Sequence, residues 1–231
     1  MRLVAYNVSG GPDALAAGQL LARLAPDVVC LTEIPAMGRF KALARFAGLE
    51  VVARAGRRGT GTAILASEQV RVRATNLVPL STPRDVPSRQ ATHAILSVAG
   101  LGLSVTAVQF GLRPEVRRTN LEEMLTFLAT IEQPSVIGAD LNESVRSPVA
   151  AALSERFQDA HAVAGTGAGL TYPTVDPSTR QDFVFVSRRL EVRSVMTPAD
   201  GSVAQASHHL PVVVDLGPGP GARPTTEEAA T

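Results

Sequence analysis

Val136-Ile137-Gly138-Ala139-Asp140-Leu141-Asn142 is a short apolar run that ends in a carboxylate, a leucine spacer and an amide. The apolar and β-branched residues of 135–139 follow Pro134 and predict a buried strand. Alternate residues of a strand face the same side, so Asp140 and Asn142 are expected to point the same way where the extended geometry continues past the strand. An Asx-type turn is the alternative, because Asp and Asn are also common turn residues.

The composition is that of a globular protein without a strong overall charge. The 231 residues are 45% hydrophobic and 19% charged, with a formal net charge of +1, and this length suits one large domain. Lys41 is the one lysine among 22 basic residues, which suggests a coding bias, so the abundance of arginine is not counted as evidence for phosphate binding. The single cysteine, Cys30, excludes an intrachain disulfide, and its apolar neighbours predict a core position.

Hydrophobic periodicity divides the chain into strands and helices. Strands are predicted at residues 2–8, 27–32, 50–53, 62–66, 70–78, 91–98, 103–110, 135–139, 183–186, 189–196 and 211–216, with 62–66 pairing with 70–78. Helices are predicted at residues 14–24, 37–47, 115–131 and 147–156. One domain is therefore expected over residues 1–216, followed over residues 217–231 by a Pro/Gly-rich and then polar tail that is predicted to be disordered.

Polar side chains stand at the ends of strand after strand. They are Asn7, Glu33, Gln109, Asp140, Asn142, Asp182 and His209. A turn or capping role explains any one of them. The whole series is better explained by a polar site built on loops that a rigid scaffold holds in place.

Five short sequence motifs, and their order along the chain, resemble the endonuclease/exonuclease/phosphatase superfamily, which has the DNase I-like fold. The motifs are Val4-Ala5-Tyr6-Asn7, Cys30-Leu31-Thr32-Glu33, Gly138-Ala139-Asp140-Leu141-Asn142, Asp182-Phe183-Val184-Phe185 and Ser207-His208-His209-Leu210-Pro211-Val212. The resemblance extends from Arg2 to Leu216. It implies an α/β fold, a four-layer α-β-β-α sandwich in which two packed mixed or antiparallel sheets are flanked by helices and carry the site at one end.

The resemblance also implies metal-assisted cleavage of a phosphoester. Glu33 is a hard oxygen ligand and is expected to hold Mg²⁺ or Mn²⁺, with Asn7 and His208 as further residues of the metal site. The cation would neutralise charge that develops on the phosphoryl group.

The resemblance further implies which residues are catalytic and which bind the substrate. His209, oriented by Asp182, is expected to stabilise the phosphorus centre or to handle a proton. Asp140 is expected to position or deprotonate the attacking water. Asn142, together with Asn7, is expected to donate to phosphate oxygens without adding charge, and Arg113 is expected to contact the phosphate.

Two positions depart from the family pattern. Gln109 stands where most members have a histidine or a comparable site residue, and an amide carries neither a proton nor a charge. His208 stands where an aspartate usually precedes the catalytic histidine, and imidazole prefers softer ions than Mg²⁺. The departures leave three readings open: an active enzyme, a slow enzyme, or a degenerate member that binds phosphorylated ligands without turnover.

The sequence does not select a substrate within the superfamily. A phosphodiesterase or nuclease is the first expectation, and a phosphomonoester or phospholipid-headgroup hydrolase is the alternative. The near-neutral charge argues against strong nonspecific binding of duplex DNA, so nucleic acid is a candidate partner only. Six arginines in or beside loops would make a local basic rim if they fold to one side: Arg54, Arg57, Arg58, Arg84, Arg89 and Arg113. Arg117 is expected on the exposed face of its helix. No apolar run approaches the length of a membrane span, and no leader precedes the first strand. We expect a cytoplasmic protein, or one whose targeting segment has been removed, and make no prediction of its oligomeric state.

Overall fold

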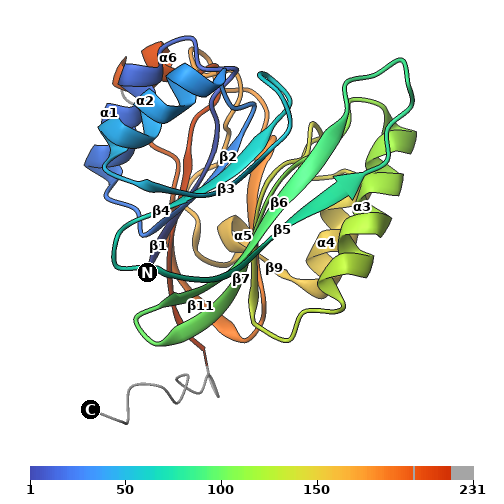
Figure 1. Cartoon of the computed structure of the whole chain (residues 1–231). Coiled ribbons are helices and arrows are strands. Elements are labelled where there is room, and N and C mark those ends of the chain that lie inside the picture. The colour runs from blue at the N-terminus through green and yellow to red at the C-terminus, as the bar shows by residue number, and fades with distance from the viewer. Residues whose placement is uncertain (200, 220–231) are drawn as a thin grey trace.

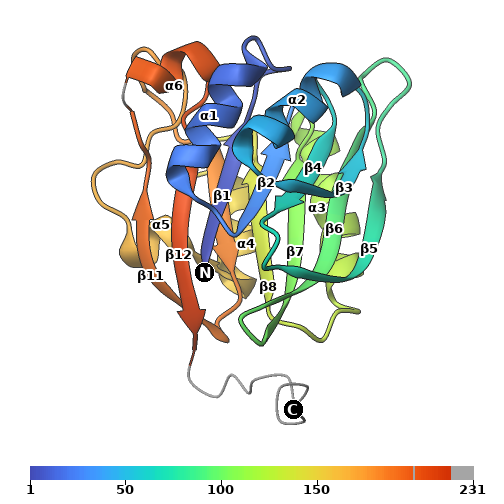
Figure 2. The same cartoon turned by 60° about the vertical axis from the view of Figure 1, so that its left-hand side comes forward.

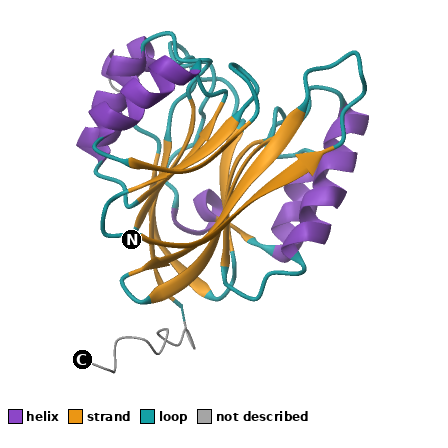
Figure 3. Ribbon diagram, in the orientation of Figure 1, coloured by secondary structure: helices purple, strands orange, loops and turns teal. Residues whose placement is uncertain are grey.

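Two six-stranded sheets pack face to face, and helices cover their outer faces (Figure 1). The computed structural model describes residues 1–199 and 201–219. Coloured by secondary structure, the sheets form the two inner layers and the helices the two outer layers (Figure 3). The expected four-layer sandwich is confirmed.

The first sheet joins both ends of the described chain. Its strands are β1 (Arg2–Asn7), β2 (Val28–Thr32), β3 (Glu50–Ala55), β4 (Thr62–Ala66), β11 (Leu190–Met196) and β12 (Val212–Pro218). They are ordered β11-β12-β1-β2-β4-β3. β1 is parallel to β2 and antiparallel to β12, so the first and last strands are neighbours.

The second sheet is built from the middle of the chain. Its strands are β5 (Arg71–Leu80), β6 (Arg89–Val98), β7 (Leu101–Gln109), β8 (Ser135–Asp140), β9 (Gln158–Asp159) and β10 (Asp182–Val186). They are ordered β5-β6-β7-β8-β10-β9. β7 and β8 are parallel, and the other neighbours are antiparallel.

Helices cover the outer faces of the sheets, and capping residues satisfy free backbone groups at several of their ends. On the first sheet lie α1 (Ala14–Leu24), α2 (Met37–Ala47) and α6 (Gly201–Ala206); on the second lie α3 (Pro114–Leu128) and α4 (Pro148–Arg156); α5 (Ala160–Ala164) contacts β10 and β11. Asp13 caps α1 by accepting from two backbone amides, and Gly48 ends α2 with a φ of 68°. Among the described residues, none of the helices has the length and apolar character needed to cross a bilayer.

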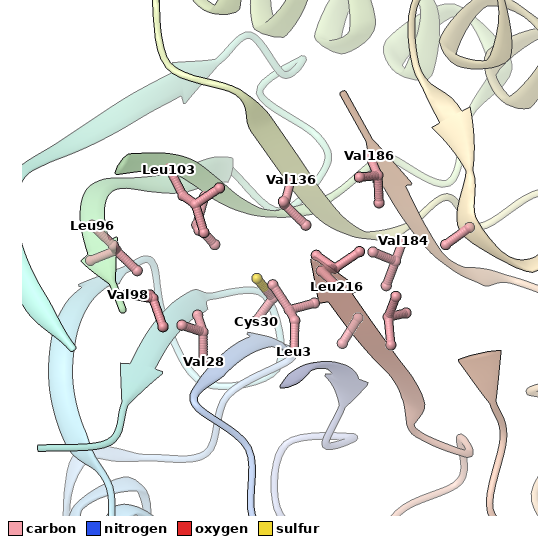
Figure 4. Close-up of a cluster of buried hydrophobic side chains, with 14 of the residues drawn as sticks. Leu3, Val28, Cys30, Leu96, Val98, Leu103, Val136, Val184, Val186 and Leu216 are labelled. Carbon is pink, nitrogen blue, oxygen red and sulfur yellow. The ribbon is translucent and has the colours of Figure 1, made fainter. Parts of the chain in front are cut away.

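The apolar core fills the space between the two sheets (Figure 4). Leu3, Val28 and Cys30 come from the first sheet, and Val136 and Val184 come from the second. Cys30 is 1% exposed, and burial raises the pKa of its thiol to about 12. The thiol is therefore neutral, and its predicted core position is confirmed.

Gly138 in β8 is required by the close approach of the two sheets. A Cβ at this position would lie 2.5 Å from the Cβ of Cys30 and 3.2 Å from that of Ala5. Gly138→Ala is therefore expected to lower the free energy of unfolding by about 1–3 kcal/mol, measured by urea denaturation. Gly38→Ala is the control, because Gly38 lies in α2 with nothing within 4 Å of the added atom and alanine favours the helix. Equal effects of the two changes would contradict the packing argument.

The structure differs from the sequence prediction at the connections. Residues 62–66 do not pair with 70–78: β4 pairs with β2 and β3, whereas β5 pairs with β6 in the other sheet. Hydrophobic alternation predicts a strand but not its partner. α5 and α6 were not predicted, because five or six residues carry too little helical periodicity.

The boundary of the domain also differs from the prediction. β12 continues to Pro218, so it extends into the segment that was expected to be a tail. Residues 220–231, the rest of that predicted tail, lie outside the described residues.

Candidate active site

The polar residues predicted at strand ends come together at one end of the sandwich. β1 and β2 are parallel and end there, and antiparallel β12 begins there (Figure 2). In the other sheet, β7 and β8 end at the same place, where β10 begins. The site is therefore assembled from both sheets.

An aspartate–histidine pair forms one side of the site. Nδ1 of His209 lies 2.8 Å from Oδ2 of Asp182, and both side chains are buried. Burial lowers the pKa of His209, but the attraction and hydrogen bond of Asp182, with the nearby charges of Asp140 and Glu33, raise that pKa to about 9. The imidazole is therefore protonated at neutral pH.

Short polar contacts hold this pair in place. The hydroxyl of Ser207 donates to the carbonyl oxygen of Asn7 at 2.6 Å and accepts from the backbone amide of His209 at 3.1 Å. The hydroxyl of Thr171 accepts from the backbone amide of Asp182 at 3.1 Å. The ring of Tyr172 lies on His209, with 4.8 Å between the ring centroids. These contacts leave His209 little rotational freedom.

Asp140 is the centre of the site. Its carboxylate accepts from Nδ2 of Asn7 at 2.8 Å and from Nε2 of Gln109 at 2.9 Å through one oxygen, and from the backbone amide of Asn142 at 2.9 Å through the other. Burial and the charge of Asp182 raise the pKa of Asp140, while His209 and the hydrogen bonds to Asn142 and Asn7 act in the opposite direction. Two carboxylates thus share a buried space beside one imidazolium.

Gln109 connects Asp140 to Glu33. Its Nε2 donates to Oε1 of Glu33 at 2.7 Å and also to Asp140, and its Oε1 accepts from the guanidinium of Arg89. Arg89 is 7% exposed; burial lowers its pKa, and the charges of Glu33 and Asp140 act against that effect. The neutral amide of Gln109 therefore connects the guanidinium of Arg89 to the carboxylates of Glu33 and Asp140 through hydrogen bonds.

The loop after β8 does not continue the strand. Asn142 has a φ of 51°, and its backbone amide bonds Asp140, as in an Asx turn. Its side chain donates to the carbonyl oxygen of Phe110 at 2.8 Å. The expectation that Asp140 and Asn142 point the same way in extended geometry is therefore wrong, and the turn alternative is confirmed. Glu33 has a similar backbone, with a φ of 49°, and residues in this sparsely populated region often cluster at functional sites.

A group of three buried residues offers ligands for a divalent cation. One ligand atom each from Asp140, Asp182 and His209 lies within 4.8 Å of the others. The two carboxylates are hard oxygen ligands, and a cation between them would relieve the repulsion that raises the pKa of Asp140. The two carboxylates therefore suit a divalent cation, whereas the protonated ring of His209 has no lone pair to offer it.

The residues predicted to hold the metal are placed differently from this group. Glu33 is half-buried and joins it through Gln109. Both atoms of the Asn7 amide are engaged, with Asp140 and with the backbone amide of Ser9. His208 is exposed and is not among the three. Metal binding by Glu33, Asn7 and His208 stays a prediction.

The arginines near the site differ from their expected roles. Arg113 is exposed and its guanidinium pairs with Asp85 at 2.7 Å, so phosphate contact by Arg113 stays a prediction. Arg117 was expected on the exposed face of its helix, but it is buried and pairs with Glu143 at 2.7 Å. Arg89 was predicted only as a loop residue at a basic rim. No sequence signal separates Arg89 from the other arginines, because its position depends on the contact with Gln109.

A two-sheet sandwich with acid, amide and histidine side chains at the ends of its strands is the architecture that the resemblance to the endonuclease/exonuclease/phosphatase superfamily implies. Residues 4–207 match the sequence model of the Endonuclease/Exonuclease/phosphatase family, and the chain belongs to this family. A search of curated proteins finds no match.

Solved structures share the fold at low sequence identity. An endonuclease/exonuclease/phosphatase from Bacteroides vulgatus has a TM-score of 0.82 and 20% identity, over 94% of this chain and 98% of that one. A mannosyl-6-phosphatase from Bacteroides thetaiotaomicron has a TM-score of 0.79 and 16% identity, over 94% and 99%. The human Nocturnin catalytic domain, with a bound sulfate anion, has a TM-score of 0.71 and 16% identity, over 94% of both chains.

Proposed function

We propose that the protein is a divalent-metal-dependent phosphodiester hydrolase. The observation that carries the proposal is the buried Asp182–His209 pair beside Asp140, with Glu33 connected through Gln109. An imidazolium next to two carboxylates can supply and accept a proton within one site. The sulfate held by the similar Nocturnin domain is consistent with a fold that accommodates a tetrahedral anion.

The reaction follows from the charges of these groups. Asp140 orients the attacking water and accepts its proton as the new P–O bond forms, a role that suits a carboxylate whose pKa is raised. The P–O bond to the leaving alcohol breaks, and protonated His209 donates a proton to the leaving oxygen. Asp182 keeps the ring oriented and charged. Glu33 would hold Mg²⁺ or Mn²⁺ beside these carboxylates, and the cation would neutralise charge on the phosphoryl oxygens.

The departures at Gln109 and His208 are compatible with activity. Gln109 is hydrogen-bonded to two carboxylates, so it organises acids without carrying charge itself. His208 is exposed, and within the described chain its backbone amide contacts the hydroxyl of Ser9 at 3.2 Å. We therefore favour an active enzyme over a member that binds phosphorylated ligands without turnover.

The test is hydrolysis in Mg²⁺ and, separately, in Mn²⁺, with EDTA as the metal-free reference. The substrates are a chromogenic aryl phosphodiester, an aryl phosphomonoester and plasmid DNA, which separate the phosphodiesterase, phosphatase and nuclease alternatives. We expect metal-dependent cleavage of the diester that is lost in Glu33→Ala. The matched control is Glu68→Ala, an exposed glutamate after β4 at the opposite end of the sheet. No cleavage of any substrate by the folded wild-type protein would refute the proposal and favour a binding role.

A further inference from the structure

The loop that follows β1, residues 9–11, is attached to the candidate active site. The backbone amide of Ser9 donates to the side-chain oxygen of Asn7 at 2.8 Å. The backbone amide of Gly10 donates to the carbonyl oxygen of Glu33 at 2.6 Å. Because Asn7 and Glu33 are both residues of the site, these two hydrogen bonds hold the 9–11 loop in a fixed place beside it.

Two exposed guanidinium groups border the 9–11 loop. Arg39 lies in the first turn of α2, and its Nη1 donates to the carbonyl oxygen of Gly11 at 3.4 Å. Arg58 lies on the loop between β3 and β4, and its Nε is 3.9 Å from the position that a Cβ on Gly10 would occupy. Among residues 1–199 and 201–219, no carboxylate pairs with either guanidinium. Both positive charges are therefore available to a ligand.

Backbone hydrogen bonds fix the loop that carries Arg58. The amide of Gly61 donates to the carbonyl oxygen of Arg57 at 2.7 Å, which closes the loop. The amide of Gly59 donates to the carbonyl oxygen of Ile34 at 3.0 Å, which ties the loop to the chain just after the glutamate that follows β2. A loop that is already formed binds a ligand without the cost of being ordered.

The charges around the 9–11 loop favour an anion. Asp13 is the one carboxylate in residues 8–13, and it accepts from two backbone amides as the cap of α1. The backbone amide of His208 donates to the hydroxyl of Ser9 at 3.2 Å. The family usually has an aspartate at the position of His208, whereas an imidazole carries no negative charge. Guanidinium groups match the geometry of phosphate with parallel donors, so a phosphate is the anion that this surface suits.

We propose that Arg39 and Arg58, named here the arginine pair, bind a second phosphate of the substrate, next to the phosphate that is cleaved. The proposal rests on the proposed function, because it assigns the substrate class of the same site. The 9–11 loop connects Glu33, beside which the cleaved phosphate would lie, to the arginine pair. The preferred substrates are therefore phosphodiesters that carry a second phosphate close to the first.

Direct binding tests the arginine pair without turnover. Propane-1,3-diphosphonate and propylphosphonate carry P–C bonds that a phosphoester hydrolase does not cleave, and they differ only in the second phosphonate. By calorimetric titration in Mg²⁺, the wild-type protein is expected to bind the diphosphonate about 10-fold more tightly than the monophosphonate, because charge-assisted hydrogen bonds hold the second group. This preference should shrink as NaCl is added, because salt screens exposed charges.

Substitution of the arginine pair should remove this preference. Arg39→Gln and Arg58→Gln are each expected to reduce it about 3-fold, and the double variant should bind the two phosphonates equally, with the affinity for propylphosphonate unchanged. Chelation of Mg²⁺ by the diphosphonate is the same for every variant, so it cancels in the comparison. Arg156→Gln is the matched control, because Arg156 is an exposed arginine at the end of α4. Both arginines are exposed, and thermal melting first checks that each variant is folded.

A third probe distinguishes two sources of the second phosphate. Labelled hexathymidylate is titrated by fluorescence polarisation in EDTA, where a metal-dependent enzyme does not cleave it. Binding that is weakened in the double variant assigns the second phosphate to a neighbouring nucleotide. No binding of hexathymidylate, together with a retained preference for the diphosphonate, assigns it to a small molecule with two phosphates. Both results support the arginine pair.

The outcomes separate this inference from the proposed function. An unchanged preference for the diphosphonate in the folded double variant overturns the arginine pair, even if hydrolysis is observed. An equal loss of preference in Arg156→Gln also overturns it, because the overall charge of the protein then explains the effect. If no substrate is hydrolysed but the preference depends on the arginine pair, the proposed function fails while the anion site stands.

Discussion

Replacing Asp182 by asparagine is expected to lower kcat by about 10²–10⁴-fold, the range associated with an oriented general acid. Asp182 bonds Nδ1 of His209 at 2.8 Å and is a main reason why the pKa of His209 is raised to about 9. Asparagine keeps the shape but removes the charge. The pKa of His209 should then fall, because burial lowers it and less attraction opposes that effect.

The pH dependence of kcat distinguishes this explanation from a general loss of structure. A group with a raised pKa is protonated up to that pKa, so the wild-type protein should lose activity on the alkaline side as His209 loses its proton. In the Asp182→Asn variant, the alkaline fall of kcat should occur at a lower pH than in the wild-type protein. Asp176→Asn makes the same chemical change on an exposed loop and should leave both kcat and the pH of this fall unchanged. An unshifted fall in a folded Asp182→Asn protein would show that Asp182 does not act through His209.

Replacing Arg89 by methionine is expected to reduce kcat/KM by about 10–100-fold. Losses of this size are usual when a residue is removed that orients the side chains in contact with the metal or the substrate. Arg89 acts through Gln109, whose Oε1 it holds so that Nε2 faces Glu33 and Asp140. Without the arginine the buried amide oxygen loses its partner, and two carboxylates lose a nearby positive charge. Arg89 is in this sense a positioning residue.

The conservative variant Arg89→Lys provides the decisive readout. Lysine restores a positive charge and one donor but not the planar fork of arginine, so it should recover part of the lost activity. Arg84→Met removes an exposed arginine from the loop that precedes β6 and should have little effect. Metal affinity, followed by Mn²⁺ titration, should weaken in Arg89→Met and recover in Arg89→Lys. If both Arg89 variants lose activity equally and melt at the same lower temperature, the arginine supports folding alone.

The strands and the main helices of this fold could be predicted from the sequence because each one is a local pattern. The helix at residues 14–24 and the strand at residues 62–66 have the same bounds as α1 and β4. The partner of each strand was harder to predict from the sequence. β4 and β5 are neighbours in sequence but belong to different sheets, and only packing of the two inner faces decides this.

The residues of the site could be predicted from the sequence, but the hydrogen bonds between them could not. The polar residues at strand ends converge, because parallel and antiparallel neighbours bring those ends to one edge. The hydrogen bonds within the site depend on the distance between the two sheets, and no short sequence motif predicts that distance. For this reason Arg89 was assigned to a surface rim and Arg117 to an exposed helix face, although both are buried.

The hydrogen bonds of the site connect the two sheets of the sandwich. Asn7 and His209 belong to the first sheet's side, Gln109 and Asp182 to the second, and the bonds Asn7–Asp140, Glu33–Gln109 and Asp182–His209 cross between them. Neither sheet alone contains an acid–histidine pair or a linked set of carboxylates. During folding, catalytic competence can therefore arise only when the two halves dock, and recovered activity after denaturation reports that last step rather than the formation of either half.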